Sequence, residues 1–188
     1  MYVKTHPVPF GEFIPFRRQL ASVISRFDRV PRDFAAGEKP GLLDIAGVPV
    51  GDVICFEIAY GEVVDAVVSG GARVITVQTN NATYGGTAQP DQQFQIERLR
   101  AIEAGRSVVV ASTTGISAVI RPDGSVQARM EQSQTGWLNE SVDLRGTPTP
   151  AQRAGKPVEA AILLAAVGSL AVAAVRSVRS SRSPRLAA

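Results

Sequence analysis

Two short apolar runs separated by a helix-like stretch constrain the fold of this 188-residue chain more than any other feature. Residues 73–78 are rich in β-branched side chains, and residues 107–112 form a run of the kind found in strands buried on both faces. Between them, residues 89–104 have the length and spacing of a helix with Phe94, Leu99 and Ile102 on its apolar side. Strand, helix and strand in this order predict an α/β fold.

Further elements extend this pattern into a mixed sheet. The turn at Ala46-Gly47 and the loop Arg121-Pro122-Asp123-Gly124 both punctuate strand-like runs. The charged side chains of the 89–104 helix are expected to be mostly solvated, namely Glu97, Arg98, Arg100 and Glu103. The other elements expected are strands at 42–45, 48–50 and 53–56, short helices at 19–27 and 63–68, and a hairpin of 116–120 with 125–130.

The C-terminal part contains a long run without charge, Ala160 to Val175. As a helix this run, with its flanks, covers roughly 24–27 Å at ~1.5 Å per residue, slightly less than a hydrocarbon core of ~30 Å. Its many small residues suit packing in lipid, and Arg176 can extend the span by snorkelling. We therefore predict a linker at 146–157, a transmembrane helix at 158–176 and a basic tail at 177–188.

Composition and charge exclude several classes of function. The chain is 45% hydrophobic and 20% charged, as globular proteins are. The formal charge of +3 is accounted for by arginines near the C-terminus, so it gives no indication of nucleic-acid binding by the folded part. The N-terminus lacks the apolar core of a secretory signal. With one cysteine and one histidine, a metal site is poorly supported, and no cofactor is expected.

The single cysteine, Cys55, follows a strand-like run and precedes Glu57 by two residues. It cannot form an internal disulfide. Two interpretations remain open from the residues alone: a buried structural thiol, or a nucleophile whose thiolate is stabilised by neighbouring charge. On a continuing strand Glu57 would share a face with Cys55, although the chain can also turn there.

Three motifs together decide between these interpretations. They are Tyr2-Val3-Lys4-Thr5-His6-Pro7-Val8-Pro9-Phe10-Gly11-Glu12, then Cys55-Phe56-Glu57, and then a set at 79–86, 93–94, 98–106 and 114–117. In content, order and spacing they resemble the nitrilase superfamily and, within it, the apolipoprotein N-acyltransferase family. The resemblance covers roughly residues 2 to 130.

The resemblance implies the second half of a nitrilase-like α-β-β-α sandwich at residues 1–145, followed by the transmembrane helix. It implies a Glu-Lys-Cys triad in which Cys55 is the nucleophile and Lys4 stabilises the oxyanion. It also implies that Glu12 and Glu57 support the site without being the general base. The family's general-base glutamate lies upstream of the lysine, so the chain is expected to be a fragment or to act with a separate chain that supplies the first half.

By resemblance, the expected reaction transfers an acyl chain from a phospholipid, through a Cys55 thioester, to the N-terminal amine of a lipoprotein. The catalytic part would then face the outside of the cell membrane, with the arginine-rich tail in the cytoplasm. Two alternatives remain: a soluble nitrilase-type amidohydrolase using the same residues, or an inactive fragment or subunit. His6, the only histidine, is interpreted as a loop residue rather than a partner of Cys55.

Overall fold

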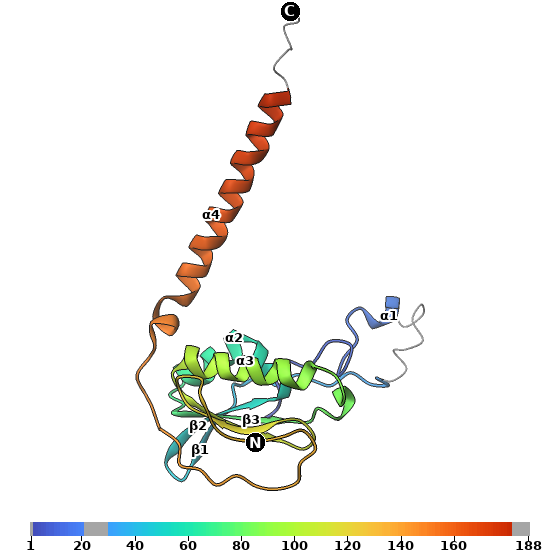
Figure 1. Cartoon of the computed structure of the whole chain (residues 1–188). Helices are drawn as coiled ribbons and strands as arrows, with labels where there is room; N and C mark the ends of the chain where they lie inside the picture. Colours follow the sequence, from blue (N-terminus) through green and yellow to red (C-terminus); the bar gives the residue numbers. More distant parts are fainter. Residues whose placement is uncertain (1, 21–29, 182–188) are drawn as a thin grey trace, which may run out of the picture. The chain divides into compact units, whose positions relative to one another are not determined.

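The computed structural model describes residues 2–20 and 30–181 of the chain, which divides into two compact units (Figure 1). The first unit ends at Thr149 and contains a β-sheet, and the second begins at Pro150 and contains a long helix. Most of the predicted helix at 19–27 and the end of the predicted basic tail lie outside the described residues. The first two residues of that predicted helix belong to α1 (Arg17–Leu20). All of the predicted site residues lie in the first unit.

The sheet of the first unit has six strands in chain order, from β1 at one edge to β6 at the other. The central strands β2, β3 and β4 run parallel, and the pairs outside them are antiparallel. The prediction of a mixed sheet in an α/β fold is confirmed. The strands are β1 (Leu42–Ile45), β2 (Val48–Ile54), β3 (Val74–Thr79), β4 (Ser107–Ser112), β5 (Ser117–Ile120) and β6 (Val126–Met130).

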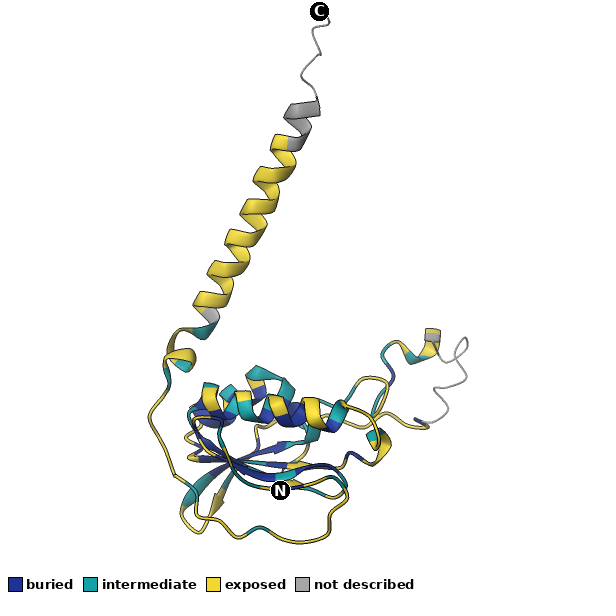
Figure 2. Ribbon diagram, in the orientation of Figure 1, coloured by how far each residue is buried: buried dark blue, intermediate teal, exposed yellow. Residues whose placement is uncertain are grey.

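Two helices, α2 (Gly61–Ser69) and α3 (Gln89–Ala104), cover one face of this sheet (Figures 1 and 2). Alternate residues of the parallel strands point toward these helices and form the core, because side chains along a strand alternate between its faces. Gly51 in β2 allows α2 to approach closely, since a Cβ there would lie 2.8 Å from Cγ2 of Val67. The core therefore lies between the sheet and the two helices.

The opposite face of the sheet is only partly covered, by the segment that follows β6 (Figure 1). Trp137 and Leu138 of this segment line a hollow of about 500 Å³ together with sheet residues, and Gln78 and Ala111 on the same face are exposed. The predicted sandwich has two sheets and two helical layers. The first unit contains one of each.

The structure corrects three details of the predicted elements. The predicted strand 53–56 ends at Ile54, because the chain turns into a 3₁₀-helix at Cys55. In α3 the predicted faces are partly wrong: Leu99 and Ile102 are 58% and 51% exposed. Glu97 is only 2% exposed and the side chain of Arg100 only 15%, although both were predicted to be solvated. The physical reason is that each of these polar groups has a hydrogen-bond partner inside the unit, described below.

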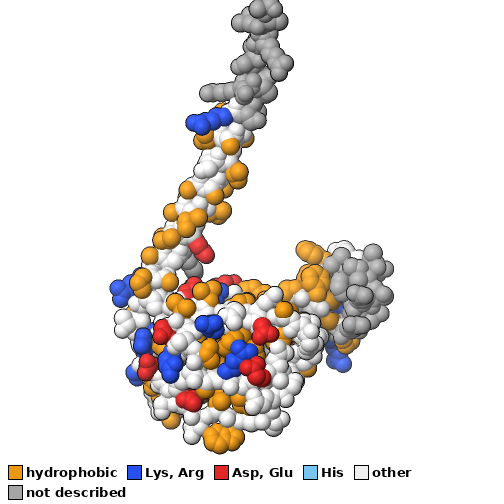
Figure 3. All heavy atoms as spheres, in the orientation of Figure 1, with side chains coloured by type: hydrophobic (Ala, Val, Ile, Leu, Met, Phe, Trp, Pro, Cys, Tyr) orange, Lys and Arg blue, Asp and Glu red, His pale blue; other side chains and the backbone are white. Residues whose placement is uncertain are grey.

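The second unit is the helix α4 (Pro150–Ser181). It starts inside the predicted linker, because a proline is well tolerated at the first position of a helix. The stretch Pro157–Arg176 has 20 residues and a mean hydropathy of 2.3, and by length and composition it is sufficient to cross a membrane. Its surface is apolar or uncharged over most of its length (Figure 3). The division into catalytic part, span and tail remains a prediction.

Candidate active site

Cys55 lies at a sharp turn where β2 passes directly into the 3₁₀-helix η2 (Cys55–Ala59). Its φ of 56° is in the left-handed region, which residues with a side chain adopt at an energetic cost. Its side chain is partly exposed. A partly exposed side chain on a left-handed turn at the carboxyl end of a strand has the backbone arrangement of a nucleophile elbow.

Glu57 connects this turn to the N-terminal segment. Its side chain is fully buried, and its carboxylate accepts a hydrogen bond from the backbone N–H of Ile54 at 2.9 Å, just before the turn. The other donors come from the N-terminal motif: both N–H and hydroxyl of Thr5 at 2.7 and 2.8 Å, N–H of His6 at 3.0 Å, and the hydroxyl of Tyr2 at 2.9 Å. The chain therefore turns after Cys55, and Glu57 does not continue on a strand.

The electrostatics of Glu57 follow from these donors. Burial raises the pKa of the Glu57 carboxyl, but the hydrogen bonds from Ile54, His6 and Thr5 outweigh burial and lower it overall. Burial, together with the proximity of Glu57, raises the pKa of the Tyr2 phenol to about 12, although the hydrogen bond to Thr5 opposes this shift. An ionised carboxylate thus holds the segment before and after Lys4 beside the Cys55 turn.

Lys4 and Glu12 form an ion pair that joins the two ends of the loop between them, residues 5–11. The ammonium group lies 2.9 and 2.8 Å from Oε1 and Oε2 of Glu12, and the Lys4 side chain is only 12% exposed. Oε2 of Glu12 also accepts a hydrogen bond from the N–H of Val8 at 2.8 Å. Because the backbone N–H of Val8 holds the Glu12 carboxylate in place, that carboxylate orients the Lys4 side chain.

The four predicted site residues therefore form two linked pairs. Lys4 pairs with Glu12, and Glu57 belongs to the Cys55 turn and binds the backbone next to Lys4. Within the described part of the chain, no hydrogen bond joins Lys4 to the Cys55 thiol. The structure thus places the cation and the thiol on segments connected by Glu57, and their catalytic roles remain a prediction.

The ring of His6 contacts Thr5, Tyr60 and Glu62, and no hydrogen bond joins it to Cys55 in the described part of the chain. Its ring stacks near the ring of Tyr60, with centroids 4.9 Å apart, and its Nδ1 lies 3.0 Å from the hydroxyl of Thr5. Its Nε2 is 3.8 Å from the carboxylate of Glu62 in α2. These contacts agree with the interpretation of His6 as a loop residue.

Arg100 of α3 binds the end of the 3₁₀-helix η2, which begins at Cys55. Its guanidinium donates to the carbonyl oxygens of Ile58 and Ala59, at 3.0 and 2.7 Å, and it pairs with Glu103 on its own helix. These carbonyls belong to the end of a short helix, where backbone acceptors lack intrahelical partners. The arginine thereby holds the end of the turn that presents the thiol, a role that charge patterning along α3 did not predict.

Polar residues after β3 and β4 complete the carboxyl edge of the sheet next to Cys55. Thr114 donates to Oδ1 of Asn80 at 3.2 Å, which joins the two loops. Asn81 is 3% exposed and is bound to Gln93 of α3. No sequence signal identified Gln93 or its neighbour Glu97 as buried, because polar residues on a helix are usually solvated. The structure therefore adds a polar layer beneath the loop after β3.

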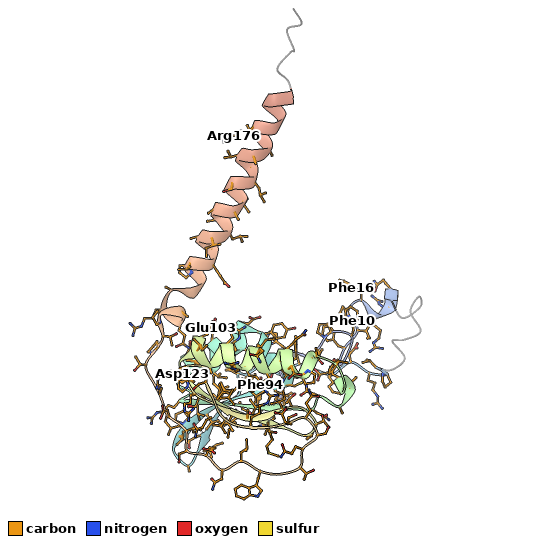
Figure 4. The ribbon with its side chains drawn as sticks, in the orientation of Figure 1. Phe10, Phe16, Phe94, Glu103, Asp123 and Arg176 are labelled. Atoms are coloured by element: carbon orange, nitrogen blue, oxygen red, sulfur yellow. The ribbon has the colours of Figure 1, made fainter. Side chains whose placement is uncertain are left out.

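The N-terminal segment also carries two aromatic residues that are exposed to solvent. Phe10 and Phe16 are 56% and 75% exposed and both have positive φ, and Figure 4 shows them on the same end of the first unit. Among the described residues, no group of three or more His, Cys, Asp or Glu side chains is arranged to hold a metal ion.

The chain is similar in sequence to several known proteins. The carbon-nitrogen hydrolase family model matches residues 1–148. The chain is 39% identical over 171 residues to an apolipoprotein N-acyltransferase of Mycolicibacterium smegmatis, covering 91% of the chain and 28% of that protein. It is 38% identical over 177 residues to the protein of the same name from Ralstonia nicotianae, covering 90% of the chain and 33% of that protein. The chain thus spans about a third of the length of these relatives.

Solved structures of the nitrilase superfamily are also similar to the chain, at lower identity. Nit3 of Saccharomyces cerevisiae is 21% identical with a TM-score of 0.47, covering 54% of this chain and 40% of the other. An amidase from Nesterenkonia is 23% identical with a TM-score of 0.46, covering 56% and 42%. The family model, which extends over more than half of the chain and includes the Lys4 loop, the Cys55 turn and the whole sheet, shows that the chain belongs to the carbon-nitrogen hydrolase family.

Proposed function

We propose that the chain provides the nucleophile of an N-acyltransferase that moves an acyl chain from a phospholipid to the N-terminal amine of a lipoprotein. The observation that carries the proposal is the partly exposed Cys55 on a left-handed turn, connected by buried Glu57 to the loop that holds the Lys4–Glu12 pair. The names of the relatives at 38–39% identity support the choice of acyl transfer over other reactions of the family.

In the first step, the Cys55 thiolate attacks the carbonyl carbon of the phospholipid ester. A C–S bond forms, the C–O bond breaks, and the lysophospholipid leaves as an alcohol after receiving the proton that came from the thiol. In the second step the lipoprotein amine attacks the thioester, the C–S bond breaks and an amide forms, while the amine's proton returns to the sulfur. Both steps pass through an oxyanion.

Lys4 stabilises these oxyanions. Its ammonium group is mostly buried and is oriented by Glu12, so its charge acts in surroundings that water screens weakly. Glu57 holds the backbone on the C-terminal side of Lys4 at the turn. Glu12 and Glu57 are already engaged with Lys4 and with backbone donors, so the proton transfers are assigned to a glutamate in a first half of the domain, supplied by a polypeptide segment outside these 188 residues.

The membrane location follows from the substrates and from α4. A diacylated lipoprotein and a phospholipid are both anchored in a bilayer, and Pro157–Arg176 is long and apolar enough to cross one. The arginines at and after the end of the apolar stretch favour a cytoplasmic C-terminus, and we therefore assign the first unit to the outer side of the cell membrane.

The test is isolation of the acyl-enzyme. Membranes that contain the chain together with its first half are incubated with a phospholipid labelled in the acyl chain. We expect label on Cys55 that hydroxylamine removes, and none on Cys55→Ala. Addition of a diacylated lipopeptide should transfer the label to the peptide amine. Label that passes only to water would favour an amidohydrolase-type reaction. No label on the folded wild-type protein would contradict the proposal and favour an inactive subunit.

A further inference from the structure

Four buried polar side chains form a closed set of hydrogen bonds beneath the carboxyl edge of the sheet. They come from β3, from the loop after it and from α3, and each is at most 7% exposed. The hydroxyl of Thr79 donates to Oδ1 of Asn81 at 3.2 Å, and Nδ2 of Asn81 donates to Oε1 of Gln93 at 3.1 Å. Nε2 of Gln93 donates both to the Thr79 hydroxyl at 3.3 Å and to Oε1 of Glu97 at 3.0 Å.

The bonds among Thr79, Asn81 and Gln93 form a ring in which each group donates to the next. All donors in such a ring point the same way around it. A side-chain amide that rotates by half a turn exchanges the positions of its oxygen and nitrogen and can reverse this order, because the two ends have nearly the same shape. Glu97 lies outside the ring and accepts the second N–H of Gln93. This bond therefore holds the Gln93 amide in place, and Gln93 in turn holds the Asn81 side chain.

The position of Asn81 matters because its loop lies next to the nucleophile. β3 is the parallel neighbour of β2, and Ile54, the residue before Cys55, pairs with Gln78. Asn81 also fits tightly against the loop after β4, since a Cβ on Gly115 would lie 2.3 Å from its Oδ1. Turning the Asn81 amide over would replace an oxygen by an NH₂ group at this close contact.

We propose that Glu97 is a positioning residue that fixes Asn81 through Gln93 and thereby holds the loop of residues 80–84 in place beside Cys55. Because this loop follows the strand next to the one that ends before Cys55, an effect on catalysis is expected, and that part rests on the function proposed above. Burial raises the pKa of the Glu97 carboxyl to about 8, despite the opposing hydrogen bond from Gln93, so the group is mostly uncharged at neutral pH. An uncharged carboxyl and a glutamine amide each offer a carbonyl oxygen to Gln93.

The first experiment measures hydrogen–deuterium exchange of the full chain in detergent. Peptides covering residues 80–87 report on the loop, and peptides from β4 report on the whole unit. The variants are Glu97→Gln, which keeps a carbonyl oxygen; Glu97→Met, which removes it at similar length; and Glu97→Asp, which withdraws it by one methylene. Gln92→Met is the control with a matched side-chain length, because Gln92 lies on the same helix but is exposed and outside the ring.

We expect Glu97→Met and Glu97→Asp to speed exchange in the loop roughly tenfold, the effect of losing a buried hydrogen bond. Exchange in β4 should stay unchanged, whereas a purely structural role would raise exchange in both regions. Glu97→Gln and Gln92→Met should match wild type. If the Met variant does not fold, the milder Asp variant carries the test. A loop as slow in both variants as in wild type, or a Gln variant as fast as the Met variant, would overturn the proposal.

A second measurement separates this inference from the proposed reaction. The variants are prepared in the same way as the wild-type protein that forms a labelled thioester. At saturating phospholipid, Glu97→Met should form the thioester more slowly than wild type, while iodoacetamide should alkylate Cys55 at the same rate in both. The Gln variant should restore the rate. If the variants that loosen the loop form the thioester at the wild-type rate, the positioning role is wrong. If wild type forms no thioester, the proposed function fails, and the exchange data still decide whether Glu97 holds the loop.

Discussion

The surroundings of Glu57 and of Glu97 differ in the number of donors they provide to a buried carboxyl group. Glu57 is 0% exposed and accepts hydrogen bonds from five donor groups, three of them backbone N–H groups. Glu97 is 2% exposed and has one donor, an amide of Gln93. Burial raises the pKa of both groups, but hydrogen bonds lower the pKa of Glu57 overall, whereas the pKa of Glu97 rises to about 8.

This comparison shows that burial alone does not set the charge of a carboxyl group. At neutral pH, Glu57 is an anion that collects the backbone of the Lys4 loop around itself, and its region is organised by charge. Glu97 is mostly neutral, and its region is organised by hydrogen bonds among uncharged side chains. The Cys55 turn receives backbone support from Glu57 and also from Arg100 of α3, the helix that carries Glu97.

The largest expected difference between the two regions is their response to a change from glutamate to glutamine. In Glu57→Gln, either orientation of the new amide turns its NH₂ group toward a backbone N–H, of Thr5 and His6 or of Ile54. Buried donors left unpaired, together with the lost charge-assisted bonds, should cost about 3 kcal/mol or more of unfolding free energy. Denaturant unfolding of the chain in detergent measures this loss.

Glu62→Gln is the control for that measurement, because the Glu62 side chain is 61% exposed. A loss of less than about 1 kcal/mol in Glu57→Gln, comparable to an ordinary surface change, would show that the anion does not organise the loop.

The second prediction concerns the cation that the Glu57 region holds. Lys4→Ala should slow thioester formation at Cys55 by ~10² or more, roughly 3 kcal/mol of transition-state stabilisation, because an oxyanion donor is lost. His6→Ala should do far less, since the ring of His6 contacts Tyr60 and Thr5. The readout is label on Cys55, with protease resistance as the check of folding. The reverse order of effects would indicate a Cys-His pair and contradict the assignment of Lys4.

Sequence reasoning predicted the Glu57 region far better than the Glu97 region. The strands, the helix at 89–104 and the family motifs were recognisable because apolar periodicity is local in the chain, as are the spacings within the pair Lys4 and Glu12 and within the pair Cys55 and Glu57. The turn at Cys55 was not predicted as such, since a left-handed φ on a cysteine depends on the contacts of Glu57 across more than fifty residues. Glu97 was missed because its only signal is a partner, Gln93, that is itself a polar residue.

The third prediction turns the raised pKa of Glu97 into a dependence of stability on pH. In the unfolded chain a glutamate has a pKa of about 4.3, and in the folded chain that of Glu97 is about 8. Between these values the folded state binds more protons, so the unfolding free energy falls as pH rises, and it levels off above about pH 8. Relative to Glu97→Gln, wild type should lose up to about 1.4 kcal/mol per pH unit at the steepest part.

Unfolding of both proteins between about pH 5 and pH 9 measures this difference. Subtracting the variant from wild type removes the contribution of Asp52, whose pKa burial also raises. Parallel curves for the two proteins would mean that Glu97 is ionised in the folded state, with donors comparable to those of Glu57.

The smallest expected effect tests the orientation of α3, on which the burial of Glu97 depends. Leu99 was predicted to face the core, but it is 58% exposed two residues after the buried Glu97. Leu99→Gln should therefore change the unfolding free energy by no more than about 0.5 kcal/mol, as surface substitutions do. Phe94→Ala, on the buried side of the same helix, should cost about 3–5 kcal/mol and serves as the contrasting variant. If Leu99→Gln were as costly as Phe94→Ala, the helix would be rotated, Glu97 would lie nearer to solvent, and its contrast with Glu57 would disappear.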